Sequence, residues 1–194
     1  MESEHQSILV MIVDCDPKAW SIRSDNNNIA NNNLIKLDDY IRSIVFFISS
    51  YCLLHRYNQV VIIANHPQNP KILYPRRDND DNCKDNFVPT MHLLPSIIAQ
   101  GILSATQDIA SLKSDNTNEK KSSLSQCLSL SLCMISKQLK KFSKLQPRIL
   151  ISQVTKDDST TYNAVMNSIF SAQRYILLLL SSLVLINIVI IIKK

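Results

Sequence analysis

Apolar positions follow two different rhythms along the chain, and the two rhythms alternate. Continuous apolar runs with polar ends are typical of strands buried on both faces, whereas apolar residues that recur every three or four positions predict amphipathic helices. The strands are expected at residues 7–13, 59–66 and 148–154, with a short edge element at 71–75. The helices are expected at residues 34–57, within 91–112 after Pro95, at 123–142 and at about 159–174. The alternation predicts an α/β fold, with a doubly wound, mainly parallel sheet and helices on both faces.

The same periodicity predicts which side of each helix faces the sheet. In the first helix these positions are Leu34, Leu37, Ile41, Val45, Ile48, Cys52 and His55. In the second they are Ile98, Ile102, Ala105, Ile109 and Leu112. In the third they are Leu124, Cys127, Leu128, Leu132, Ile135 and Leu139.

Composition places the chain among globular proteins of one domain. The chain has 194 residues, of which 45% are apolar and 19% are charged, so a sizeable core can form. The net charge of +5 is scattered in pairs of basic residues that are not interleaved with aromatics. This pattern does not favour direct, sequence-specific binding of nucleic acid.

The five cysteines have no spacing typical of a metal site. Their number is odd, no CxxC pair occurs, and the acidic N-terminus does not resemble a signal peptide, so we expect a reducing compartment. Buried free thiols are therefore expected at Cys15, Cys52, Cys83, Cys127 and Cys133.

Two carboxylates follow the first strand, where parallel sheets bind their ligands. Asp14 and Asp16 fit the start of a phosphatase motif of the haloacid dehalogenase type, in which the first aspartate attacks phosphorus beside magnesium. Ser152 and the acids at 157–158 could complete such a site. However, Lys18 stands where that motif has threonine or valine, and the acids follow Ser152 too closely.

The alternative for this corner is a von Willebrand factor A domain, whose first strand ends in Asp-x-Ser-x-Ser and holds a divalent cation through oxygen ligands. Here Asp16 and Lys18 replace the two serines, and the lysine ammonium would repel a cation. We therefore expect a degenerate metal site at Asp14, Asp16 and Lys18. The plainer interpretation is that the Asp14 carboxylate accepts hydrogen bonds from the backbone of the loop after its own strand.

Four segments in one order resemble a single family over residues 7–174. They are "LVMIVDCDPKAW", "VVIIANHPQNPKILYP", "SLSLCMISKQL" and "RILISQVTKDDSTTYNAVMNSIFSAQR". The family is the smaller von Willebrand-A subunit of the transcription and DNA-repair factor TFIIH. Pro17, Trp20, His66 and the Tyr74–Pro75 pair also agree with it.

The resemblance implies a structural subunit without catalytic residues or a cofactor. Such a subunit works in the nucleus, in transcription initiation by RNA polymerase II and in nucleotide excision repair. Its implied partners are the other TFIIH core subunits, chiefly the larger one that combines a von Willebrand-A domain with zinc modules. Zinc is expected only in full-length relatives. The partner-binding surface and the contacts of the loop at 76–86 stay open, as does the role of Trp20, as an interface anchor or a lid on the core.

The last twenty residues depart from this family. Residues 175–194 hold 15 apolar residues among the 18 from Tyr175 to Ile192. We expect a partial von Willebrand-A-like domain at 1–174, incomplete at its C-terminal side, followed by an apolar tail. The tail could be a gene-model artefact, a membrane anchor, or a replacement fifth strand formed by residues 176–180, which would cover an exposed sheet edge.

Overall fold

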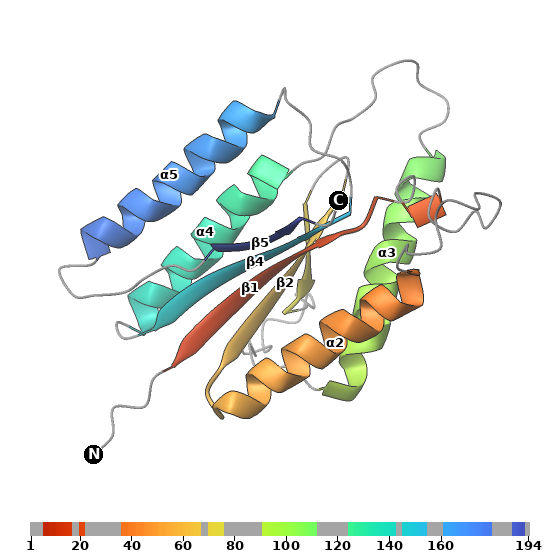
Figure 1. The fold of residues 1–194 in the computed structure, drawn as a ribbon, viewed down its shortest axis with the longest axis horizontal. Coiled ribbons are helices and arrows are strands. Elements are labelled where there is room, and N and C mark those ends of the chain that lie inside the picture. Colours follow the sequence, from red (N-terminus) through yellow and green to blue (C-terminus); the bar gives the residue numbers. More distant parts are fainter. Residues whose placement is uncertain are drawn as a thin grey trace.

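One five-stranded sheet forms the centre of the computed structural model (Figure 1). The structure describes residues 6–16, 20–21, 36–66, 70–75, 91–111, 124–142, 145–154, 161–179 and 188–192. The strands are β1 (Ser7–Asp14), β2 (Gln59–Asn65), β3 (Lys71–Tyr74), β4 (Gln146–Gln153) and β5 (Ile188–Ile192). Their order across the sheet is β3-β2-β1-β4-β5, and only the pairing of β3 with β2 is antiparallel.

Helices cover both faces of this sheet (Figure 1). They are α2 (Leu37–Leu54), α3 (Leu94–Ser111), which follows the short 3₁₀ helix η2 (Met91–Leu93), α4 (Leu124–Lys141) and α5 (Tyr162–Leu179). One face is packed against α2 and α3, and the other against α4, with α5 beside α4. The expected doubly wound α/β class is thus confirmed.

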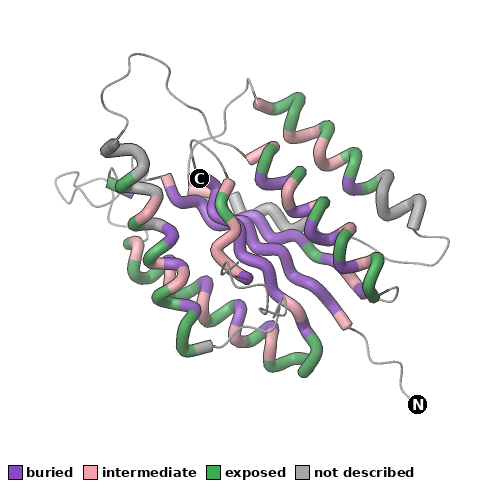
Figure 2. Tube along the Cα trace, turned by 180° about the vertical axis from the view of Figure 1, so that it is seen from behind, coloured by how far each residue is buried: buried purple, intermediate pink, exposed green. Residues whose placement is uncertain are grey.

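β1 is central because its apolar run serves both faces of the sheet. All eight of its residues are buried. Leu9, Met11 and Val13 belong to the core under α2 and α3, whereas Ile8 and Ile12 belong to the core under α4. Side chains alternate between the faces of a strand, so an uninterrupted apolar run fits only a strand with helices on both sides. In Figure 2 the buried colour is most continuous along the central strands, which are β1 and β2.

The inward faces of α2 and α4 are rotated from those expected. In α2 the buried residues are Tyr40, Ile44, Ile48 and Tyr51, while His55 is exposed and lies after the helix. In α4 they are Cys127, Leu128, Ser131, Met134, Ile135 and Gln138. Most of the residues that were expected to face the sheet but are not buried are half-buried. The expectation was based on aliphatic residues alone. Tyr, Ser and Gln side chains can also be buried, when they form hydrogen bonds or pack through their aliphatic parts. Leu34, Leu112 and the side chains of Ile102, Ala105 and Ile109 lie outside the described part.

A buried polar network closes the amino edge of the sheet. Ser7 Oγ donates to Asn58 Oδ1 at 2.8 Å and lies 2.6 Å from the Tyr51 hydroxyl. Asn58 Nδ2 donates to the Tyr51 carbonyl oxygen at 2.8 Å. These bonds tie the start of β1 to the end of α2, and they satisfy polar groups that burial would otherwise make costly.

The expected fifth strand is found at a different place. Residues 176–179 belong to α5, so the expectation of a strand at 176–180 was wrong. The strand beside β4 is instead formed by Ile188–Ile192, parallel to it, from Ile149 opposite Ile188 to Gln153 opposite Ile192. A long apolar run fits a helix or a buried strand equally well by periodicity alone. Among the described residues, no helix combines the length and the apolar character needed to cross a membrane.

Candidate functional site

Three parallel strands, β1, β2 and β4, end at the same edge of the sheet (Figure 1). The register sets Asp14 beside Asn65, and Val13 beside Ser152. This is the edge at which α/β sheets bind ligands. The sequence therefore predicted the correct edge of the sheet. The chemistry possible at this edge depends on the side chains that lie there.

The carboxylate of Asp14 is used in backbone hydrogen bonds. Asp14 is 1% exposed. Its Oδ2 accepts from the amide of Val154 at 2.9 Å, and its Oδ1 accepts from the amide of Asp16 at 3.3 Å. The first bond crosses to the end of β4, and the second closes the turn after β1. Asp14 thus joins two strand ends, which agrees with the plainer interpretation and extends it to a second strand.

An aromatic pair covers this edge. Trp20 is 5% exposed, and its Nε1 donates to the carbonyl oxygen of Asp14 at 3.2 Å. Its ring centroid lies 4.7 Å from that of Tyr40 on α2, whose hydroxyl donates to the Ser152 carbonyl oxygen at 3.2 Å. Burial raises the pKa of Tyr40 well above its ordinary value. Trp20 is therefore a lid on the core.

Two buried thiols lie at the same edge. The amide of Cys15 donates to the Asn65 carbonyl oxygen at 3.1 Å, and Cys127 Sγ lies 3.6 Å from Asn65 Oδ1. Burial, and secondarily the negative charge of Asp14 and the coupling to Cys127, raises the pKa of the Cys15 thiol far above its ordinary value. Because a thiolate is the reactive form, Cys15 is a poor nucleophile in this position.

The described residues contain no group of three or more His, Cys, Asp or Glu side chains placed to hold a metal ion. Lys18 and the acids at 157–158 lie outside the described part, so the degenerate metal site stays a prediction. The phosphatase hypothesis needs an Asp14 oxygen directed at phosphorus. It gains no support from a buried carboxylate whose two oxygens already accept backbone hydrogen bonds.

For the cysteines, the expected burial is confirmed at some positions and wrong at others. Cys15 and Cys127 are buried free thiols as expected, but Cys52 is only half-buried and Cys133 is exposed, which corrects those two expectations. Cys83 is outside the described part. His66 is buried.

Sequence reasoning missed Tyr40, Asn65 and Val154 as members of this edge. Asn65 carried a usable signal, since it is the first polar residue after the apolar run of β2. The roles of Tyr40 and Val154 depend on contacts across 112 and 140 residues of chain, which no local pattern contains.

The chain is similar in sequence to subunits of a general transcription factor. The chain is 29% identical to General transcription factor IIH subunit 3 of Dictyostelium discoideum, over 76% of this chain and 42% of that protein. It is 30% identical to the TFB4 subunit of the general transcription and DNA repair factor IIH of Arabidopsis thaliana, over 89% of this chain and 56% of that protein. The chain thus spans about half the length of the curated relatives it matches.

A crystal structure of the N-terminal domain of TFIIH p34 shares the fold. It is similar with a TM-score of 0.60 at 23% identity, and the match covers 95% of this chain and 78% of the other. The model of the Transcription factor Tfb4 family matches residues 6–187, nearly the whole chain. The chain therefore belongs to the Transcription factor Tfb4 family.

Proposed function

We propose that this chain is a non-catalytic structural subunit of a TFIIH-type core complex. It would act in the nucleus, and support transcription initiation by RNA polymerase II and nucleotide excision repair through contacts between proteins. Membership of the Tfb4 family and relatives named as subunits of a general transcription and DNA repair factor support this role.

The observation that carries the non-catalytic part is the closed edge around Asp14. Its carboxylate accepts two backbone amides, and the buried Trp20 covers it with Tyr40. Catalysis at such an edge needs oxygens directed at a substrate or a cation. Here they connect β1 to β4, so the corner where ligands bind in related sheets serves the stability of the fold.

The proposed partners are the other core subunits, chiefly the larger one with a von Willebrand-A domain and zinc modules. The chain described here would hold no cofactor of its own. The role leaves no requirement for sequence-specific contact with DNA or for a membrane.

Co-expression with the core subunits tests this function. The tagged full chain is expressed with the TFIIH core subunits, purified in two affinity steps, and the subunits that remain bound are quantified. We expect a stoichiometric complex, and no magnesium-dependent hydrolysis of p-nitrophenyl phosphate by the purified chain. Failure to associate, or hydrolysis that Asp14→Asn abolishes, would contradict the proposal.

A further inference from the structure

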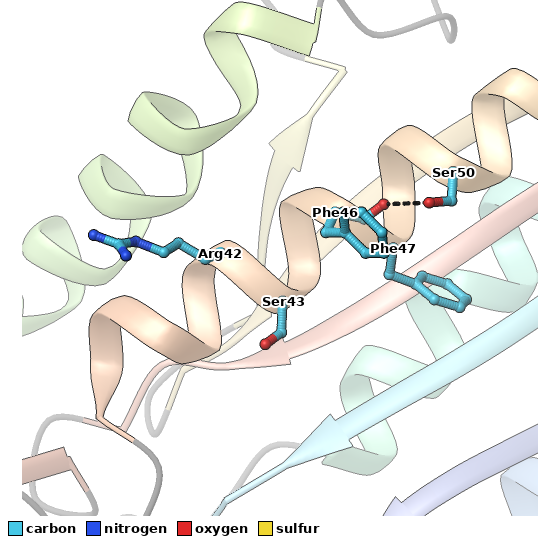
Figure 3. A pocket seen from close by; sticks show the side chains of 5 residues that line it. All are labelled: Arg42, Ser43, Phe46, Phe47 and Ser50. Atoms are coloured by element: carbon cyan, nitrogen blue, oxygen red, sulfur yellow. Dashed lines mark hydrogen bonds between the residues drawn. The ribbon is translucent and has the colours of Figure 1, made fainter.

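Several hydroxyl groups on the helices find their hydrogen-bond partner within their own helix. On the outward side of α2, which is apolar and exposed at Phe46 and Phe47, Ser50 Oγ donates to the Phe46 carbonyl oxygen at 2.9 Å (Figure 3). Ser43 Oγ donates in the same way to the Asp39 carbonyl oxygen at 2.7 Å. A short hydroxyl side chain reaches the carbonyl oxygen one turn earlier, so it needs no partner from another element.

Two buried amide groups lack such a partner. Gln138 on α4 is 1% exposed, and its Nε2 has no hydrogen-bond partner among the described residues. Gln59, the first residue of β2, is half-buried as a whole, but its Oε1 is buried and equally unpaired within that part of the chain. A buried polar atom without a partner is destabilising, and native domains contain few of them. These two atoms are complementary, because Nε2 can only donate and Oε1 can only accept.

Both residues lie on the α4 side of the sheet. Side chains two residues apart on a strand share a face, and Val61 belongs to the core under α4, so Gln59 lies on that face as well. The register sets Gln59 beside Ile8, which belongs to the same core. On α4, Gln138 follows Ile135 by three residues, which is the spacing of neighbours on one side of a helix. The two amides therefore belong to the layer between β2 and α4.

The two residues also lie at the same end of this layer. α4 runs opposite to the parallel strands, because few residues separate its end from the start of β4 (Figure 1). At the other end, Cys127 Sγ on α4 lies 3.6 Å from Asn65 Oδ1 on β2. From this contact α4 rises about 16 Å to Gln138, and β2 extends about 20 Å back to Gln59. The positions of the two amides along the layer thus differ by only about 4 Å.

The chemistry of the two atoms identifies the group that fits between them. It must accept from Gln138 Nε2 and donate to Gln59 Oε1. The side chains of the surrounding core, among them Ile8, Val61 and Ile135, have no polar atom that could do either. An ion is not indicated, because both amides are neutral. Water donates and accepts at once, and buried water molecules in proteins typically join polar groups of this kind.

We propose that one buried water molecule binds between Gln138 Nε2 and Gln59 Oε1 and joins the end of α4 to the start of β2. The water accepts from Gln138 and donates to Gln59, so neither amide remains unpaired. α4 is then held on β2 by polar contacts at both ends, at Cys127 and at Gln138. A shift of α4 by one turn would separate the two amides, so the site makes the position of the helix on the sheet specific. This inference does not depend on the proposed function.

Nuclear magnetic resonance of the full chain tests the water site directly. The glutamine side chains are labelled with ¹⁵N, and nuclear Overhauser effects from water to each side-chain amide are measured. We expect the effect of a long-lived water at Gln138 and none at Gln126, which is exposed on the same helix. No effect at Gln138 would overturn the site, and so would contacts that show a direct hydrogen bond between the two amides. This measurement needs no variant, so it decides even if a substitution prevents folding.

A double-mutant cycle tests whether the two amides share the water. Gln59→Met and Gln138→Met keep the approximate length of the side chain and remove its amide. Each single variant leaves the other amide unpaired, so we expect it to raise the unfolding equilibrium constant by about fivefold or more in urea denaturation. The double variant should be no less stable than the weaker single variant, because neither amide remains. The control Gln126→Met should stay within about twofold of the wild type.

The outcomes of the cycle separate a shared water from two independent sites. Additive effects of the two substitutions, or single variants that behave as the control does, would overturn the bridge. In Gln59→Met, the water contact of the Gln138 amide should disappear. Its persistence in that variant would assign the water to Gln138 alone and overturn the connection between α4 and β2.

Discussion

At the scale of single residues, Asp14 shows how one carboxylate can hold two strand ends together. Its two oxygens accept amides from Asp16 and Val154, and its backbone carbonyl accepts from Trp20. A buried carboxylate is costly unless hydrogen bonds compensate it. The pattern of a strand followed by aspartate therefore has a structural meaning here, although the same pattern is typical of catalytic and metal sites.

Replacing Asp14 by asparagine should lower stability. One oxygen would become an amide group that cannot accept from a backbone N–H, so a buried donor loses its partner. We expect Asp14→Asn to lower the free energy of unfolding by about 1–3 kcal/mol. The measurement is urea denaturation followed by circular dichroism. Asp38→Asn, at an exposed position in the first turn of α2, is the control and should lower stability by only about 0.3–1 kcal/mol, because it removes a favourable charge at the helix start. Equal effects of the two substitutions would show that Asp14 does not join the strands.

At the scale of elements, the close approach of α3 to β3 depends on the single glycine of the chain. A Cβ atom at Gly101 would lie 2.6 Å from Cδ2 and 2.7 Å from Cδ1 of Leu73. Glycine within a helix carries an entropic cost relative to alanine. Its position here is explained by packing, since the helix passes directly over the edge strand.

Larger residues at position 101 should overpack this contact. We expect Gly101→Val to lower the free energy of unfolding by about 1–3 kcal/mol, because the branched side chain must displace Leu73. Gly101→Ala should cost less, since the Leu73 side chain can rotate and alanine gains about 0.5–1 kcal/mol of helix propensity. In a double-mutant cycle read by urea denaturation, Leu73→Ala should reduce the penalty of Gly101→Val. Strictly additive effects would mean that the two residues do not press on each other.

α2 and α4 show where helical periodicity succeeds and where it fails. The bounds expected for α4, residues 123–142, match the helix Leu124–Lys141 closely. The buried side of each helix was less predictable, because Tyr40, Ser131 and Gln138 are buried. Periodicity counts apolar residues, so it does not register a buried polar residue such as Tyr40, which donates to the Ser152 carbonyl oxygen on β4, or Ser131, which donates to the Cys127 carbonyl oxygen within α4.

At the scale of the whole molecule, several buried or half-buried thiol and phenol groups make the fold sensitive to alkali. Burial raises the pKa of Cys52 to about 11 and, with a smaller contribution from Cys52, that of Tyr74 to about 12. The pKa of Cys15 is raised further. The unfolded chain therefore loses these protons at a lower pH than the folded chain does. Their contribution to stability is complete below about pH 9 and is lost as the pH rises above it.

We therefore expect the urea midpoint to be steady near about pH 8 and to fall steadily from about pH 9 to about pH 11. The measurement is a series of urea denaturation curves at increasing pH under reducing conditions. Cys15→Ala should make this decline shallower, whatever its effect at neutral pH, because one buried thiol is removed. A midpoint that does not change over this range would contradict the expected linkage.

The sequence by itself determined the α/β class, the placement of β1, β2, β4 and the main helices, and the edge where Asp14 lies. Each of these depends on local patterns: apolar runs, helical periodicity, and the polar residue that ends a strand. Only the tertiary structure decided that β5 is formed by Ile188–Ile192, that Val154 and Tyr40 complete the Asp14 edge, and that α2 presents a second apolar side to solvent. These features depend on which distant segments meet, and an apolar or polar residue looks the same in the sequence whether its partner lies in a sheet, in a helix or in another protein.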